Sequence, residues 1–340
     1  MKTTLPALIL LALALPLAVG FQPRANSVTP KVVDAANAFL ATLSDADRSK
    51  CTFGFASSQR TGWSNLPTGI FHRNGLRLGD MTPQQHAAVL KLVAAALSRE
   101  GYQKVTDIMN GDEVLKNAGG GRTGGRPGGG LRFGLDEYYI ALLGTPSATT
   151  HWMIQFGGHH LAINVTVVGA NSVMTPSLPA AQPAKYILNG QTIRPLGHEN
   201  DKGFALINAL NAAQLKRAVL NYSVTDLVLG PGTDGKVIQP EGIPASELDA
   251  SQQALLLDIA HEWVGILNDE AANAKMAEIK AGLPQTYFAW SGDTKNGGLA
   301  YYRIQGPTLL IEYAPQQGDL EHIHTIYRDP TNDYGAKLVR

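Results

Sequence analysis

Cysteine is nearly absent from this sequence, in which Cys51 is the single example among 340 residues. The chain cannot close an internal disulfide, so we expect its stability to come from an apolar core, supplemented by any metal that it holds. A lone cysteine can act as a nucleophile, but cysteine is more often a small buried side chain. We therefore expect Cys51 to lie in the core.

An excess of either charge is also absent, because 28 basic residues balance 28 acidic ones and the formal net charge is +0. Proteins that bind nucleic acid carry a basic surface, so the composition predicts no nucleic-acid partner. Several catalytic motifs are missing too. The sequence has no G-x-S-x-G elbow, no dinucleotide-binding fingerprint and no H-E-x-x-H, since Gly265 stands where His261-Glu262 would need a second histidine.

Long hydrophobic runs are confined to the N-terminus. Residues 1–20 contain one lysine, an apolar run from Leu5 to Val19 and small residues at the end, which is the order typical of a secretory signal peptide. An uncleaved membrane anchor is the alternative, although the run is short for a bilayer span of about 20 residues. We expect cleavage after Gly20, export to the periplasm or the extracellular space, and no stable membrane insertion afterwards.

The remaining chain, 21–340, alternates between helical and strand patterns. Apolar residues at helical spacing indicate helices, and short apolar runs separated by glycine and proline indicate strands. Because the strands must bury their apolar faces, we predict one α+β domain with a largely antiparallel mixed sheet system, built from two strand groups and covered by helices. The helical segments are 32–43, 82–100, 201–220 and 246–279, and the strand groups are 136–169 and 286–329.

The organisation of the chain gives three further expectations. The glycine-rich run 118–130 lacks the flanking strand and the Lys-containing helix of a phosphate-binding loop, so we interpret it as a surface loop. The sequence shows no internal repeat. A division near residue 200 is the alternative to a single domain.

Two histidines lie one residue apart in the segment EHIHTIY. Side chains alternate across a strand, so His322 and His324 are expected on the same face. Imidazoles that converge on one point suit a metal ion, whose ligand atoms lie about 2 Å away. The alternative is a pair of surface or core histidines held by hydrogen bonds.

A second histidine pair, His159 and His160, follows two glycines in the segment FGGHHLAIN. Adjacent residues on a strand face opposite sides, so we expect one of the two to reach a shared site, unless a bulge at the glycines brings both rings round. Glu312, at the end of an apolar strand, is a further candidate ligand, because a buried carboxylate is costly unless it is paired or bound to a metal. An exposed strand-end glutamate is the alternative.

The turn after the last histidine has the sequence RDPTNDYG. Asp329 and Asp333 can orient ligating imidazoles, and either can act as a general base. Arg328 can hold an anionic substrate or transition state. A local salt bridge around the turn is the alternative interpretation of the same residues.

The segments HWMIQFGGHHLAIN, YYRIQGPTLLIEY and HIHTIYRDPTNDYG together resemble an uncharacterised family of exported proteins, the domain of unknown function 3500. The resemblance runs from about Asp34 to the C-terminus, and the glycine-rich run looks like an insertion. It implies one intact domain with its most distinctive polar motifs at 158–160 and 322–335. It brings no activity or cofactor, so the chemistry rests on the residue types.

From these residues we expect an exported metal-dependent enzyme, and a hydrolase before other classes. The ligands of one divalent ion would be His322, His324, Glu312 and either His159 or His160. Zinc with an open position makes a bound water acidic enough to attack a small-molecule or peptide-like substrate. Copper, which suits an all-imidazole set, or iron would instead give an oxidoreductase. A non-catalytic metal- or small-ligand-binding protein is the remaining class.

Overall fold

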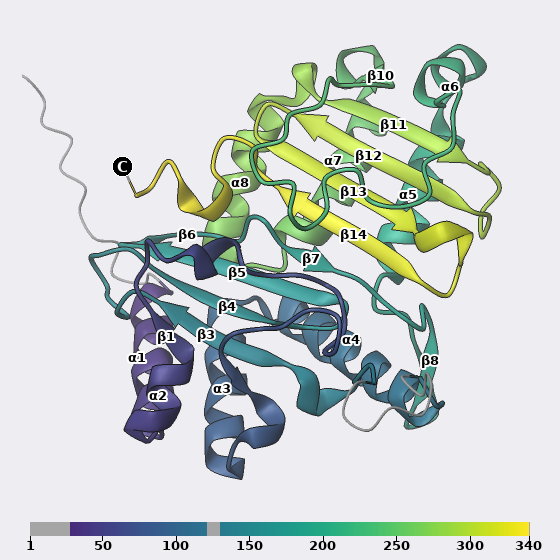
Figure 1. The fold of residues 1–340 in the computed structure, drawn as a ribbon. Coiled ribbons are helices and arrows are strands. Elements are labelled where there is room, and N and C mark those ends of the chain that lie inside the picture. Colours follow the sequence, from purple (N-terminus) through teal and green to yellow (C-terminus); the bar gives the residue numbers. More distant parts are fainter. Residues whose placement is uncertain (1–27, 121–129, 340) are drawn as a thin grey trace, which may run out of the picture.

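The computed structural model describes residues 28–120 and 130–339. The predicted signal peptide and most of the glycine-rich run lie outside the described residues. The described chain is an α+β structure, as predicted (Figure 1). Its α-helices are α1 (Thr29–Ala41), α2 (Asp45–Cys51), α3 (Pro83–Ala96), α4 (Arg99–Asn117), α5 (Gly197–Ala209), α6 (Ala212–Ala218), α7 (Ala250–Val264) and α8 (Asp269–Ala281). Among the described residues, no helix has the length and apolar character to cross a bilayer.

The strands form two main sheets, and nearly every pairing is antiparallel. The exception is β1, which runs parallel to β3 and makes the first sheet mixed. The first sheet contains β1 (Thr52–Phe53), β2 (Leu76–Arg77), β3 (Tyr139–Leu143), β4 (Trp152–Gly158), β5 (Leu161–Val168), β6 (Asn171–Val173) and β7 (Leu178–Pro179). The second contains β10 (Ile243–Pro244), β11 (Tyr287–Gly292), β12 (Ala300–Gly306), β13 (Leu309–Pro315) and β14 (Ile323–Arg328), and a separate hairpin pairs β8 (Tyr186–Leu188) with β9 (Gln191–Ile193).

The segment around β7 joins the two sheets. On one side β7 pairs with β5, and on the other its flanking residues form antiparallel bridges to β14, between Ser177 and Tyr327 and between Ala181 and Ile323. Figure 1 shows β7 lying between β5 and β14. The two strand groups therefore belong to one connected sheet system.

The same order of elements occurs twice along the chain, which the sequence did not reveal. The series α1, α2, β2, α3, α4, β3, β4, β5, β6 is followed by α5, α6, β10, α7, α8, β11, β12, β13, β14. Both α1 and α5 have 13 residues, and both α2 and α6 have 7. The parallel pairing of β1 with β3 recurs as a parallel bridge between Val219 and Trp290. The expectation of no internal repeat is therefore wrong at the level of structure.

The two copies meet at the turns of their helical hairpins. Leu97 after α3 and Leu267 after α7 form an antiparallel bridge, and the Ser98 amide donates to the Ile266 carbonyl at 3.0 Å. Gly101, in the first turn of α4, lies so close that a Cβ atom there would be 2.1 Å from the Ile266 oxygen. Glycine at this position allows the backbones of the two copies to approach each other.

Each strand has one face toward the helices and one face toward long loops. In β3, Ile140 and Leu142 belong to the large core under the helices, whereas Ala141 and Leu143 belong to a smaller cluster on the other face. The loops 54–75 and 220–242 cross this second face (Figure 1). Cys51 is fully buried in the large core, as expected, and burial raises the pKa of its thiol to about 11.

Candidate metal centre

Three imidazole rings from different parts of the chain converge at the junction of the two sheets. His160 lies in the turn between β4 and β5, His322 precedes β14 and His324 lies within it. The Nε2 atoms of His160 and His322 are 2.8 Å apart, and those of His322 and His324 are 3.1 Å apart. Ligand atoms about 2.0 Å from a tetrahedral zinc ion are about 3.3 Å from each other. The spacing of the ring nitrogens is therefore close to that of metal ligands.

The turn that carries His160 has an unusual backbone conformation. Only His159 and His160 connect β4 to β5, and His160 has φ of +60°. The hairpin between β8 and β9 uses Asn189-Gly190 for the same purpose, which is the residue pair that such turns favour. Non-glycine residues with positive φ are uncommon, and histidine is among those that tolerate this conformation better than most. Its backbone amide donates to the Asn65 carbonyl at 3.0 Å.

His159 points to a different partner from its neighbour. Its Nδ1 atom is 2.6 Å from the Asp112 carboxylate, and its ring packs against that of His160 with centroids 3.6 Å apart and planes tilted by 32°. His160 therefore faces His322 and His324, whereas His159 faces Asp112, with which His159 and His160 form a second group of possible ligands. The cause is a two-residue turn and not the alternation of a continuous strand.

Hydrogen bonding within the cluster leaves lone pairs facing each other. The Nδ1 atom of His324 lies 2.8 Å from Asp226, which places its proton there and leaves the Nε2 lone pair toward the cluster. His322 Nε2 carries at most one proton, so it cannot be a normal donor to both neighbouring rings. Burial, reinforced by His324, lowers the pKa of His322 to about 4, and burial holds that of His160 well below its usual value. Neutral rings are the form that ligates metals.

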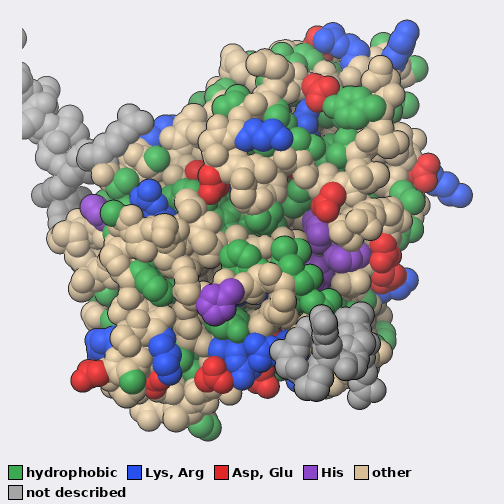
Figure 2. All heavy atoms as spheres, in the orientation of Figure 1, with side chains coloured by type: hydrophobic (Ala, Val, Ile, Leu, Met, Phe, Trp, Pro, Cys, Tyr) green, Lys and Arg blue, Asp and Glu red, His purple; other side chains and the backbone are tan. Residues whose placement is uncertain are grey.

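The candidate site reaches the surface without lying in a large cavity. His160 is buried, whereas His322 is half-buried at the edge of the cluster. Figure 2 shows histidine side chains gathered on the drawn face of the molecule. The candidate site is therefore accessible at the position of His322.

Glu312 does not join the histidines, which corrects the expected ligand set. It is fully buried, and its carboxylate accepts hydrogen bonds from the backbone amides of Val228 at 3.1 Å and Leu229 at 2.8 Å and from the Tyr301 hydroxyl. These hydrogen bonds offset the free-energy cost of removing the carboxylate from water. Glu312 therefore fixes the loop that also carries Asp226.

Arg328 and its acidic neighbours form a structural network instead of a catalytic one. The Arg328 guanidinium donates to the Leu229 and Gly230 carbonyls and pairs with Asp234 at 2.8 Å and Asp333 at 3.0 Å. The roles expected for this turn were substrate binding by Arg328 and proton transfer by the aspartates. The salt-bridge alternative replaces them, because the donors of Arg328 are already occupied.

The two aspartates of this turn are also fully engaged. Asp329 is fully buried, pairs with Lys275 and accepts from the Thr331 amide, whereas Asp333 accepts from the Asp329 amide at 3.0 Å. Neither aspartate orients a histidine of the cluster. Burial raises the pKa of Asp333 to about 6 despite its ion pair with Arg328.

Three residues that hold the histidines were missed by sequence reasoning. Asn65 Nδ2 lies 3.3 Å from His324 Nε2, and Asp226 and Asp112 bind His324 and His159. Asn65 and Asp226 lie in long loops with no periodic pattern. Asp112 is a buried acid on α4, and that burial is the one feature a sequence pattern could have indicated.

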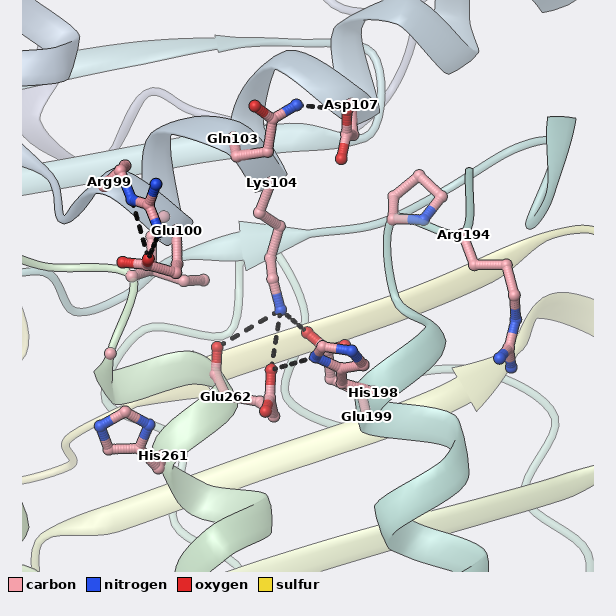
Figure 3. A pocket seen from close by; sticks show the side chains of 14 residues that line it. Arg99, Glu100, Gln103, Lys104, Asp107, Arg194, His198, Glu199, His261 and Glu262 are labelled. Carbon is pink, nitrogen blue, oxygen red and sulfur yellow. Dashed lines mark hydrogen bonds and ion pairs between the residues drawn. The ribbon is translucent and has the colours of Figure 1, made fainter. Parts of the chain in front are cut away.

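A cavity of about 610 Å³ lies elsewhere, between α4, α5 and α7 (Figure 3). Lys104 reaches down to the carboxylates of Glu199 and Glu262, and Lys202 also binds Glu262 at 2.6 Å. Burial raises the pKa of Glu199, although Lys104 opposes the effect. Each carboxylate at the floor of this cavity already has an ammonium partner.

Fold and site together define an α+β protein with a duplicated unit and a histidine cluster between its two copies. The sequence matches the model of the family described as "Protein of unknown function (DUF3500)" over residues 25–336, so the chain belongs to this family. That match confirms the resemblance drawn from the sequence segments. No curated protein and no solved structure matches the chain.

Proposed function

We propose that this protein is a metal-dependent hydrolase with His160, His322 and His324 as the metal ligands. The observation that supports the proposal is the convergence of three Nε2 atoms at 2.8 and 3.1 Å. Three protein ligands leave a fourth position open, which distinguishes catalytic zinc sites from structural ones. Zinc in such a site supplies a water molecule with a pKa of about 7.

The residues around the ligands set the ring orientations. Asp226 accepts the Nδ1 proton of His324, an arrangement that fixes the tautomer and strengthens the imidazole as a ligand. His159, fixed by Asp112, packs against the His160 ring and limits its rotation. Since Glu312, Asp329 and Asp333 are engaged elsewhere, no carboxylate among the described residues is assigned as a general base. We further propose, from the signal-peptide pattern, that the reaction takes place outside the cytoplasm.

A copper-dependent oxidoreductase is the second candidate. With Glu312 engaged by a loop, all three candidate ligands are imidazoles, and imidazole suits copper as well as zinc. Iron in oxygenases is commonly held by two histidines and one carboxylate. Glu312 does not supply that carboxylate, although Asp112, His159 and His160 also form a group that could hold an ion. Copper and zinc are distinguished by metal analysis and by the electron paramagnetic resonance signal of Cu²⁺.

The first experiment compares the metal content of the purified mature protein with that of a His322→Ala/His324→Ala double variant. A matched control is His72→Ala, which removes an exposed histidine outside the cluster. We expect close to one zinc or copper per chain in the wild type and in the control, and almost none in the double variant.

The second experiment tests catalysis with the metal-loaded protein on chromogenic esters, phosphoesters and amides. Hydrolysis that follows the metal content across the three proteins supports the proposal. Stoichiometric metal without turnover of any substrate class would favour the non-catalytic binding protein. A wild type that takes up no metal after incubation with Zn²⁺ or Cu²⁺ would overturn the proposed function.

A further inference from the structure

The Asn65 side chain also contacts the histidine cluster, and the sequence analysis did not consider this residue. Its Nδ2 atom lies 3.3 Å from the Nε2 atom of His324, while its backbone oxygen accepts from the His160 amide. The residue is buried. It therefore touches ligands from both copies of the repeated unit.

A single arginine fixes the position of Asn65. One guanidinium nitrogen of Arg73 donates to the carbonyls of Ser64 at 2.8 Å and Leu66, on either side of Asn65, and to Gly158 at 2.8 Å. Gly158 is the last residue before the histidine turn. Arg73 thus holds the backbone of Asn65 in register with His160. Such support is what a group needs if it is to act at a defined point in a site.

The amide of Asn65 loses its acceptor when a metal occupies the cluster. The proton of His324 is on Nδ1, toward Asp226, so Nε2 offers a lone pair to which Asn65 donates. A metal ion takes that lone pair. The displaced amide would then need another acceptor, which an oxygen bound at the open position would supply.

Resting on the proposed metal site, we infer that Asn65 donates a hydrogen bond to the oxygen or anion bound at the open position of the metal. In a hydrolase this donor stabilises negative charge as it develops on the attacked substrate, as donors in oxyanion holes do. Asn65 is then a catalytic residue of the site, whereas Arg73 is a positioning residue.

The test measures anion binding separately from metal binding. The protein is loaded with Co²⁺ and titrated with azide, which occupies the open position and changes the visible absorption of the cobalt. The variants are Asn65→Ala and the isosteric Asn65→Asp, and the control is Asn74→Ala, which removes an exposed amide in the same loop. Circular dichroism melting of each variant verifies folding.

We expect both Asn65 variants to bind Co²⁺ close to stoichiometrically, and Asn74→Ala to bind azide as the wild type does. Azide affinity should fall about 10- to 100-fold in Asn65→Ala, the range for one hydrogen bond to a charged group. It should fall further in Asn65→Asp, since a carboxylate repels the anion and cannot donate.

Two results overturn the inference. Unchanged azide affinity in both variants would exclude Asn65 as a donor, while loss of Co²⁺ from Asn65→Ala together with retention in Asn65→Asp would make residue 65 a metal ligand instead. Failure of the wild type to bind Co²⁺ would refute the proposed metal site itself, and that outcome is seen before any azide is added.

Discussion

At the scale of single residues, the state of each histidine depends on the partner of its second ring nitrogen. Asp226 at 2.8 Å fixes the Nδ1 proton of His324, and Asp112 at 2.6 Å does the same for His159. His160 Nδ1 is buried and has no hydrogen-bond partner among the described residues. Of the three candidate ligands, His324 is therefore the one whose orientation is fixed by a carboxylate.

Replacing Asp226 with alanine tests this dependence. Asp226→Ala removes the acceptor, so the His324 ring can rotate and change tautomer, and we expect metal affinity to fall about 10- to 100-fold without being abolished. Competition of the protein with a chromophoric chelator for Zn²⁺ measures the change. Asp258→Ala, which removes an exposed ion pair with Lys202, is the control. Equal affinities for all three proteins would show that Asp226 does not tune the site.

Local sequence rules located the candidate ligands but missed the residues that hold them in place, and the reason is physical. The alternation of side chains along a strand is a local property. Because His322 and His324 are two positions apart, their shared face could be predicted from the sequence. The contact of Asp226 with His324 spans 98 residues and exists only because a loop crosses the sheet. Glu312 was expected to be a metal ligand because a buried carboxylate needs partners, but its partners are two backbone amides and the Tyr301 hydroxyl.

At the scale of elements, the loop 226–234 connects the C-terminal strands to the histidine site. Glu312 on β13 binds its first part, and Arg328 on β14 binds Leu229, Gly230 and Asp234 in its second part. The polar residues of the RDPTNDYG turn thus stabilise the loop that presents Asp226. Their abundance in one segment reflects a buried salt-bridge network.

Replacing Arg328 with methionine removes the centre of this network. The guanidinium is buried and serves two carboxylates, so Arg328→Met leaves Asp234 and Asp333 without their partner. We expect the free energy of unfolding to fall by about 3–5 kcal/mol, as for other broken buried ion pairs. Urea denaturation followed by circular dichroism measures it.

The matched variant Arg217→Met breaks the partly exposed pair with Glu247 and should change stability by less than about 1 kcal/mol. If Arg328→Met were as stable as wild type but failed to turn over a substrate, the catalytic role expected from the sequence would be restored.

At the scale of the whole molecule, the duplicated unit explains where the site lies. One copy supplies His160 and Asn65, and the other supplies Asp226, His322 and His324. The segment around β7 joins the sheets at the same place. The helical hairpins make a second junction, where Gly101 meets Ile266. The site therefore depends on the correct docking of the two copies.

Substituting Gly101 tests the docking of the copies. Alanine normally stabilises the interior of a helix by about 1 kcal/mol over glycine, but here its Cβ would lie 2.1 Å from a backbone oxygen that cannot move aside cheaply. We expect Gly101→Ala to lower the unfolding free energy by about 1–3 kcal/mol. Gly54→Ala, where a Cβ meets nothing within 4 Å, should have little effect. A stabilised Gly101→Ala protein in thermal melts would contradict the close contact.

The class of fold could be predicted from the sequence, whereas the duplication could not. Periodicity identified most of the helices and the two strand groups, because each pattern is set within a short segment. The repeat is carried by the order and length of elements, as in the equal lengths of α1 and α5. Its equivalent positions often differ chemically, as when His159-His160 and Pro307-Thr308 connect equivalent strands. A few equivalent positions do match, such as Gly158, Leu161 and Ile163 with Gly306, Leu309 and Ile311, but so short a match did not indicate the repeat.

The central claim is that three imidazoles hold one metal ion. X-ray absorption spectroscopy of the protein loaded with one equivalent of Zn²⁺ tests it most directly. The account predicts three imidazole nitrogens at about 2.0 Å, with one further light atom at the open position. A His160→Ala variant should lose one imidazole from this shell. A spectrum dominated by oxygen ligands with no imidazole scattering, unchanged in the variant, would contradict the account.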